Sequence, residues 1–152
     1  MEKIKVLIAD DHRVVREGLA AILKTKDDIN VVGEAQDGVE AVEKTKTLMP
    51  DVILMDVSMP RMGGIEATRQ IKREFPHMGI VALTMYEEQQ YIFDLVRAGA
   101  TGYLLKDSES SQIVAAIRAS RLFIRRSPVR SWPSSPSCPR RRARSRLGLN
   151  TI

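Results

Sequence analysis

Short apolar runs recur along residues 1–105 at intervals of about 20 to 28 residues, and polar segments separate them. Most of these runs are continuously apolar rather than alternating, which is typical of parallel strands that helices cover on both faces. The runs therefore predict five strands, at residues 6–9, 31–33, 52–55, 80–83 and 103–105.

Helical patterns lie between the predicted strands. In the first of them, Val15, Leu19, Ile22 and Leu23 recur at the i, i+4, i+7 and i+8 positions that line one face of a helix. Similar patterns predict helices at residues 39–48, 65–74, 89–97 and 112–119. Alternating strands and helices with short connections favour right-handed crossovers. The expected fold is therefore an α/β, doubly wound, five-stranded parallel sheet of the (βα)5 type.

Polar residues follow four of the predicted strands. They are Asp10 and Asp11 after the first, Asp56 after the third, Thr84 after the fourth and Lys106 after the fifth. Ligands of open α/β sheets bind outside the carboxyl ends of the strands, so these side chains are expected to share one crevice. Two carboxylates 4 Å apart repel by about 4 kcal/mol at an effective dielectric of 20, so three of them need a cation. Magnesium fits, because it prefers oxygen ligands and commonly bridges carboxylates to phosphate.

Asp56 is the candidate nucleophile of this crevice. A carboxylate beside a bound cation can accept a phosphoryl group, because the cation offsets the charge that develops on the transferring oxygens. The Thr84 hydroxyl can then hydrogen-bond a phosphate oxygen, and the Lys106 ammonium can pair with one. Taken alone, an aspartate at a strand end is usually a turn former or a helix cap. The joint placement of these residues at one sheet edge favours the phosphoryl site.

These motifs, in this order and spacing, resemble the receiver domain of two-component response regulators. The resemblance covers about residues 1–120 and rests on Asp10-Asp11, residues 56–64, Thr84 and residues 102–106. Residues 8–12, 32–35 and 99–107 further resemble the NarL/LuxR-like subfamily of transcription regulators. The resemblance implies a flavodoxin-like, CheY-like fold.

The resemblance also implies the roles of the acidic residues. A sensor histidine kinase would transfer a phosphoryl group from its phosphohistidine to Asp56. Mg²⁺, or Mn²⁺ in its place, would be bound by Asp10 or Asp11, by Asp56 and by the backbone carbonyl of Ser58. His12, beside the two aspartates, is expected to cap a helix or face solvent rather than bind the cation.

Thr84 and Tyr103 match the switch pair of the family. On phosphorylation, the Thr84 hydroxyl would be drawn to the phosphate and Tyr103 would move into the vacated space. The surface of the fourth helix, the fifth strand and the fifth helix would change as a result. The alternative for Tyr103 is an ordinary half-buried aromatic residue of a strand.

The net charge of +5 divides into two parts of opposite sign. Residues 1–109 carry 14 Lys and Arg against 19 Asp and Glu, a net charge of −5, whereas residues 110–152 carry ten Arg and no acid, a net charge of +10. The basic overall balance therefore does not describe the predicted domain, which is acidic. We expect a receiver domain at residues 1–121 and a separate basic segment, rich in Arg, Ser and Pro, at residues 122–152.

The segment after residue 121 departs from the family. A NarL/LuxR-like regulator continues into a DNA-binding helix-turn-helix domain, but residues 127–152 contain four prolines, six serines and no apolar periodicity. Such a composition cannot bury enough surface to fold alone. We expect a disordered tail, or the remnant of a frameshifted or truncated gene. Resequencing of the locus tests the frameshift. The absence of a helix-turn-helix from all three downstream frames would contradict it. The ten arginines could alternatively bind nucleic-acid phosphates non-specifically.

Other classes of protein fit the residues less well. A haloacid-dehalogenase-type phosphatase also uses a nucleophilic aspartate and Mg²⁺, but it places the nucleophile after the first strand and a second aspartate two residues on, where this chain has Ser58. A flavodoxin needs hydroxyls and amides where Asp10 and Asp11 would repel the flavin phosphate. A stand-alone module whose phosphorylation controls docking differs from a transcription regulator only in output.

As a receiver, the chain would not be an ordinary enzyme. At most, Asp56 gains a phosphoryl group from small donors and loses it by autodephosphorylation.

The location and partners follow from the same features. No run of about 18 apolar residues could cross a bilayer, and the first residues do not match a secretory signal peptide, so the cytoplasm is expected. A single cysteine, Cys138, excludes an internal disulfide. The expected partners are the sensor histidine kinase, a second copy of the chain through the receiver surface, and DNA only through a missing output domain.

Overall fold

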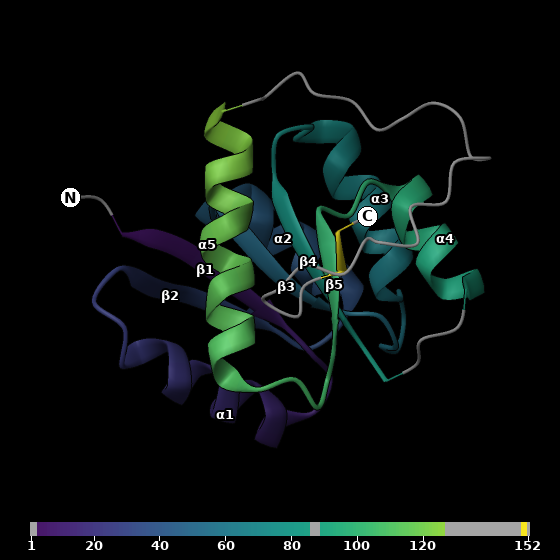
Figure 1. Ribbon diagram of the computed structural model, residues 1–152. Coiled ribbons are helices and arrows are strands. Elements are labelled where there is room, and N and C mark those ends of the chain that lie inside the picture. Colours follow the sequence, from purple (N-terminus) through teal and green to yellow (C-terminus); the bar gives the residue numbers. More distant parts are fainter. Residues whose placement is uncertain (1–2, 86–88, 127–149, 152) are drawn as a thin grey trace.

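The computed structural model describes residues 3–85, 89–126 and 150–151. Within residues 3–85 and 89–126, five strands alternate with five helices (Figure 1). The strands are β1 (Ile4–Ala9), β2 (Ile29–Ala35), β3 (Val52–Asp56), β4 (Gly79–Thr84) and β5 (Gly102–Leu105). The helices are α1 (Arg13–Lys24), α2 (Gly38–Leu48), α3 (Gly64–Glu74), α4 (Gln89–Ala98) and α5 (Ser110–Arg126). None of the helices within the described ranges is both long and apolar enough to span a bilayer.

The strands form one sheet in the order β2-β1-β3-β4-β5-β6. The first five strands are parallel; the chain runs from β1 to one edge at β2 and then, from β3 onward, toward the other edge. This reversal defines a doubly wound sheet, and in such sheets ligands bind beside the reversal point, here the carboxyl ends of β1 and β3. The parallel five-stranded α/β fold predicted from the sequence is confirmed.

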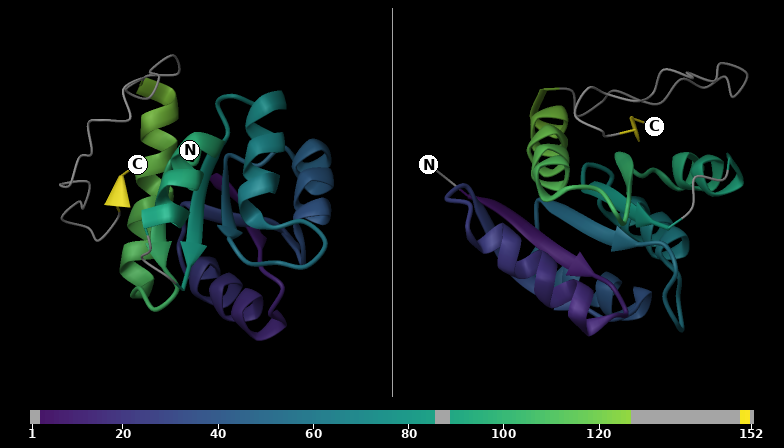
Figure 2. Two further views of the ribbon diagram at one scale, coloured as in Figure 1. Left: turned by 90° about the vertical axis from the view of Figure 1, so that its right-hand side faces the viewer. Right: turned by 60° about the horizontal axis from the view of Figure 1, so that its bottom comes forward.

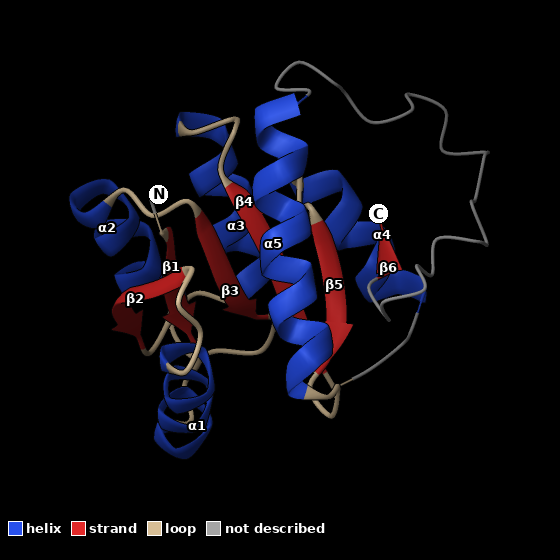
Figure 3. Cartoon of the chain, turned by 60° about the vertical axis from the view of Figure 1, so that its left-hand side comes forward, coloured by secondary structure: helices blue, strands red, loops and turns tan. Residues whose placement is uncertain are grey.

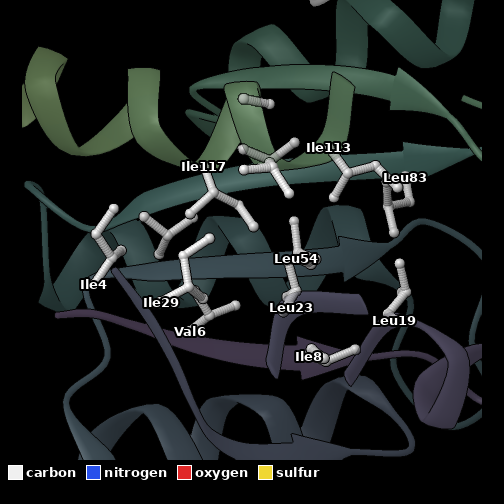
Figure 4. Packing of buried hydrophobic residues seen from close by; sticks show 14 of the residues in the cluster. Ile4, Val6, Ile8, Leu19, Leu23, Ile29, Leu54, Leu83, Ile113 and Ile117 are labelled. Carbon is white, nitrogen blue, oxygen red and sulfur yellow. The ribbon is translucent and has the colours of Figure 1, made fainter. Parts of the chain in front are cut away.

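Helices cover both faces of the sheet (Figures 2 and 3). On one face, α1 and α5 pack against Val6, Ile8 and Leu54 in a buried cluster (Figure 4). On the other face, α2 and α3 cover Leu7 and Ile53. Neighbouring residues of one strand thus face opposite helix layers, which explains why the strands are continuously apolar.

Two features lie beyond the predicted domain boundary at residue 121. Helix α5 continues to Arg126, because residues 120–126 contain no Gly or Pro that would end it. The strand β6 (Asn150–Thr151) pairs antiparallel with β5 and adds a sixth strand that the sequence did not predict. A strand at the edge of a sheet presents unpaired backbone groups that can accept such a pairing. Residues 127–149 and 152 of the predicted basic tail lie outside the described residues.

Candidate functional site

Three carboxylates meet at the carboxyl edge of the sheet. Asp56 is the last residue of β3, and Asp10 and Asp11 follow β1 directly. Because β1 and β3 are neighbouring parallel strands, the residues that follow them lie side by side. Potential ligand atoms of Asp10, Asp11, His12 and Asp56 all lie within 4.8 Å of one another. The structure thus brings together the acidic residues that the strand-end argument singled out.

Three hydrogen bonds hold Asp10 in this position, where its surface is fully buried. Its N–H donates to the Ala35 carbonyl at 3.0 Å, which joins the ends of β1 and β2. Its Oδ1 accepts a hydrogen bond from the His12 N–H at 2.8 Å. Arg16, on the first turns of α1, reaches back and donates from Nη1 to the Asp10 carbonyl at 2.7 Å. The turn between β1 and α1 is therefore fixed from both sides.

Lys106 joins the two buried carboxylates. It follows β5, and its N–H donates to the Thr84 carbonyl at 2.9 Å, which aligns the ends of β4 and β5. Its Nζ lies 3.1 Å from Asp10 Oδ2 and 3.1 Å from Asp56 Oδ1. The Lys106 side chain is only 15% exposed, so little water screens these ion pairs.

The electrostatics of the site raise the pKa of Asp56 above its ordinary value. Burial, followed by the charge of Asp10, raises the pKa of Asp56 to about 6, although the Lys106 ammonium and the Ser58 N–H oppose the shift. Burial would lower the pKa of Lys106, but its pairing with Asp56 and Asp10 outweighs burial and raises that pKa above the ordinary value. One lysine therefore offsets only part of the negative charge of the three aspartates.

The residues present fit a divalent cation with oxygen ligands. Asp56 is only 2% exposed, and its Oδ2 accepts no hydrogen bond from the described residues. A buried carboxylate oxygen without a partner is costly, and a hard cation is a natural partner for it. The cluster of Asp10, Asp11 and Asp56 has the donor chemistry of a magnesium site, since all three supply carboxylate oxygens.

Of the two predicted switch residues, Thr84 lies at the sheet edge that carries the carboxylates, and Tyr103 lies within the sheet opposite Ala82. Thr84 ends β4, and at the adjacent β3 position Asp56 pairs with Leu83, so Thr84 lies at the same sheet edge. Thr84 is 2% exposed, and Tyr103 is 6% exposed in a buried cluster with α4 residue Leu95. Tyr103 is therefore more deeply buried than an ordinary half-covered strand residue.

Ser58, His12 and Arg16 complete the surroundings of the carboxylates. The Ser58 N–H donates to Asp56 Oδ1 at 3.3 Å, while the use of its carbonyl as a metal ligand stays a prediction. His12 is the N-cap residue of α1 without a side-chain capping bond; its side chain is 66% exposed, and its Nδ1 lies 3.1 Å from Asp11 Oδ1. The sequence analysis missed Arg16, because no spacing signal shows that a helical arginine turns back to a strand end.

Comparisons with known proteins agree with this geometry. A family model described as the response regulator receiver domain matches residues 6–118. The transcriptional regulatory protein LiaR of Bacillus subtilis is 50% identical over 116 residues, which are 76% of this chain and 55% of LiaR. The oxygen regulatory protein NreC of Staphylococcus carnosus is 47% identical over 116 residues, 76% of this chain and 54% of NreC.

Solved structures give the same result. The signal receiver domain of the putative response regulator NarL from Mycobacterium tuberculosis has a TM-score of 0.76 and 35% identity, and the match covers 80% of this chain and 98% of that one. A LuxR-family two-component response regulator from Aurantimonas has a TM-score of 0.76 and 34% identity, with 80% and 86% covered.

The fold and the site together define a CheY-like α/β domain with an acidic site at its carboxyl edge. The chain belongs to the family of receiver domains of two-component response regulators, and its relatives are transcription regulators of the NarL/LuxR type. The family predicted from the motifs is confirmed. The chain spans about half the length of the curated relatives it matches.

Proposed function

We propose that Asp56 accepts a phosphoryl group from the phosphohistidine of a sensor histidine kinase. The observation that carries this proposal is the state of Asp56 itself. Its buried Oδ2 accepts no hydrogen bond from the described residues, while the Lys106 ammonium lies 3.1 Å from its Oδ1. A carboxylate beside a fixed ammonium, with one oxygen that accepts no hydrogen bond, can place one oxygen on a divalent cation and use the other to attack a phosphorus atom.

The proposed resident cation is Mg²⁺, and Mn²⁺ would serve in its place. Its ligands would be Asp10, Asp11, Asp56 and the carbonyl of Ser58. When bound, the cation offsets the negative charge that builds up on the transferring oxygens. Asp56 must be ionised to attack, and a pKa of about 6 leaves most molecules ionised between pH 7 and pH 8.

In the transfer step, an Asp56 oxygen forms a bond to phosphorus while the P–N bond to the kinase histidine breaks. The imidazole leaves with the electron pair of that bond. Lys106 would pair with one phosphoryl oxygen, and the Thr84 hydroxyl would donate to another. Hydrolysis of the acyl phosphate by water would restore Asp56. The chain would therefore act as a phosphoacceptor, with self-phosphorylation from small donors and autodephosphorylation as its only chemistry.

The output would follow from the movement of Thr84 toward the phosphate. Tyr103, buried beside α4 in this structure, would move into the space that Thr84 leaves. The surface formed by α4, β5 and α5 would then change between two states. A new local charge of about −2 is the physical cause of the bias.

The whole protein would be a cytoplasmic transcription regulator, with the receiver at residues 1–121 and the basic segment at residues 122–152 as a distinct unit. The family match to residues 6–118 supports the receiver boundary. LiaR carries the description of a transcriptional regulatory protein, and the DNA contact would come from an output domain. The alternative is a stand-alone module that uses the same site. In its phosphorylated state it would dock a partner or a second copy of the chain.

Intact-protein mass spectrometry after incubation with acetyl phosphate tests this function. We expect the chain to gain one phosphoryl group, only with Mg²⁺ present, and Asp56→Ala to gain none. Asp27→Ala, which removes an exposed aspartate far from the site, should be labelled like the unaltered chain. Labelling of Asp56→Ala to the same extent would show that the acceptor has been assigned to the wrong residue.

A further inference from the structure

The loop that follows Asp56 is closed at its base. The Val57 N–H donates to the Leu83 carbonyl at 3.0 Å, and the Gly64 N–H donates to the Val57 carbonyl at 2.9 Å. A Cβ atom at Gly64 would stand 2.0 Å from the Asp56 carbonyl oxygen, so only glycine permits this approach. Backbone hydrogen bonds thus hold the base of the loop, and other contacts hold its tip.

The tip of the loop is fastened to the start of α2. The Gly38 N–H donates to the Met62 carbonyl at 2.9 Å, and a Cβ atom at Gly38 would come within 2.3 Å of that oxygen. Arg61 donates from Nε at 2.9 Å and from Nη2 at 2.7 Å to Asp37 Oδ2. We call these four residues, Asp37, Gly38, Arg61 and Met62, the loop clamp.

Asp37 is itself firmly held. It is 5% exposed, and its second oxygen, Oδ1, accepts a hydrogen bond from the Glu40 N–H at 2.8 Å as the N-cap of α2. Burial would raise the pKa of Asp37, but the Glu40 N–H and the Arg61 guanidinium outweigh burial and hold that pKa below its usual value. The carboxylate that anchors Arg61 is therefore charged and fixed.

Arg61 adopts an unfavourable backbone conformation to make this contact. Its φ of 65° lies in the left-handed region, where a residue with a Cβ atom is strained. Among the described residues, only Met49 is another non-glycine residue with a positive φ. Such a conformation persists only where the surroundings hold it in place.

We propose that the loop clamp positions Ser58 for the cation, which makes Arg61 a positioning residue of the phosphorylation site. This inference rests on the proposed function. Ser58 lies in the clamped loop, three residues before Arg61, and its N–H contacts Asp56 Oδ1 at 3.3 Å. A shift of the loop tip would therefore move the Ser58 carbonyl relative to the carboxylates of the site.

A purely electrostatic role for Arg61 makes the opposite prediction. A guanidinium repels a divalent cation, so if Arg61 acted through its charge alone, its removal should tighten Mg²⁺ binding. If the clamp positions a ligand, loss of Arg61 should instead weaken binding. Residues that orient metal ligands directly change metal affinity by roughly 10–100-fold on mutation. Arg61 acts one step further away, and we expect a weakening of about threefold to tenfold.

The test is an NMR titration of the full chain with MgCl₂, which follows the Ser58 backbone amide and yields the Mg²⁺ dissociation constant. Arg61→Gly removes the guanidinium and also relieves the strain at positive φ, so the variant should fold. Arg61→Lys keeps the charge but loses the two-pronged contact, and it should weaken binding in the same direction by a smaller factor.

Arg118→Ala is the matched control. Arg118 forms a comparable pair with Asp28, with Nε at 2.8 Å and Nη2 at 2.9 Å, but on α5 and outside the clamped loop. This variant should bind Mg²⁺ within about twofold of the unaltered chain. Thermal unfolding without Mg²⁺ shows that each variant is folded.

The outcomes separate the two proposals. If the unaltered chain binds Mg²⁺ and both Arg61 variants bind it equally well or more tightly, the positioning role is wrong and the proposed function stands. If the unaltered chain does not bind Mg²⁺ at all, the proposed function and the positioning role both fail. Weakening in Arg61→Gly with no change in Arg118→Ala supports the positioning role.

Discussion

At the scale of single residues, Asp56 combines burial with a shortage of partners. It is 2% exposed, and both burial and the neighbouring Asp10 raise its pKa to about 6. The Lys106 ammonium lowers the pKa of Asp56 and so offsets only part of this rise. The proposed phosphoacceptor is therefore a group that the folded chain holds at a cost in stability, as is common at functional sites.

This cost should appear as a pH dependence of stability. The folded pKa of Asp56, about 6, lies above its ordinary value of 3.8. The folded chain therefore binds this proton more tightly than the unfolded chain, and the resulting stabilisation is fully present below about pH 4 and lost as the pH rises through 6. A shift of about two pKa units corresponds to about 3 kcal/mol. Asp56→Asn should therefore be more stable than the unaltered chain by up to about 3 kcal/mol at pH 8, and by much less at pH 4.

Urea unfolding in EDTA between pH 4 and pH 8 measures this difference. Asp27→Asn, which removes an exposed carboxylate, should not reproduce the pH dependence. A gap between Asp56→Asn and the unaltered chain that stays constant from pH 4 to pH 8 would contradict the raised pKa.

The proximity of Asp10, Asp56 and Lys106 could be predicted from the sequence, because parallel strands bring their carboxyl ends to one edge. The pairing of Arg61 with Asp37 could not. The two residues are 24 positions apart, and their contact depends on the conformations of the two loops that carry them. The spacing of apolar residues along the chain carries no information on loop conformation.

At the scale of elements, the helix starts differ in how they are satisfied. The first N–H groups of a helix lack partners within it. Asp37 caps α2 through its side chain, whereas His12 and Gly63 at the starts of α1 and α3 make no side-chain capping bond. Asp37 thus serves the helix with one oxygen and the loop clamp with the other.

The two roles of Asp37 can be separated. Asp37→Ala removes both, and we expect the free energy of unfolding to fall by about 1 to 2 kcal/mol, most of it from the lost cap. Asp37→Asn keeps a good capping group, so its loss should stay below about 0.5 kcal/mol. Urea unfolding measures both values. Equal losses in the two variants would mean that the charge of Asp37, not its capping bond, stabilises α2.

Element boundaries were less predictable than element types. Strand β2 was predicted at residues 31–33 but runs over Ile29–Ala35, because several of its residues are only half-buried and tolerate polar side chains such as Glu34. The central strands β3 and β4 are buried throughout, and their apolar runs matched the strands closely. The apolar signal fades where a strand is partly open to water.

At the scale of the whole molecule, the sheet separates two buried layers, and its central strands contribute to both. Leu54 of β3 is fully buried between the sheet and the α1–α5 layer. Leu54→Ala should lower the free energy of unfolding by about 2 to 5 kcal/mol, through lost burial and the cavity left behind. Val14→Ala is the control: Val14 is 81% exposed on α1, and its loss should change stability by less than about 0.5 kcal/mol. A Leu54→Ala loss no larger than that of Val14→Ala would contradict the packing.

The strand order β2-β1-β3-β4-β5 also determines how long a strand made on the ribosome waits for its neighbour in the sheet. Val6 of β1 pairs with Val52 of β3, 46 residues later, which takes about 2 to 9 s at 5–20 residues per second. Lys106 follows Asp56 by another 50 residues, or about 3 to 10 s. During that interval Lys106 cannot pair with Asp10 and Asp56. Until it is added, the counter-ions that could take its place beside these carboxylates are protons and dissolved cations.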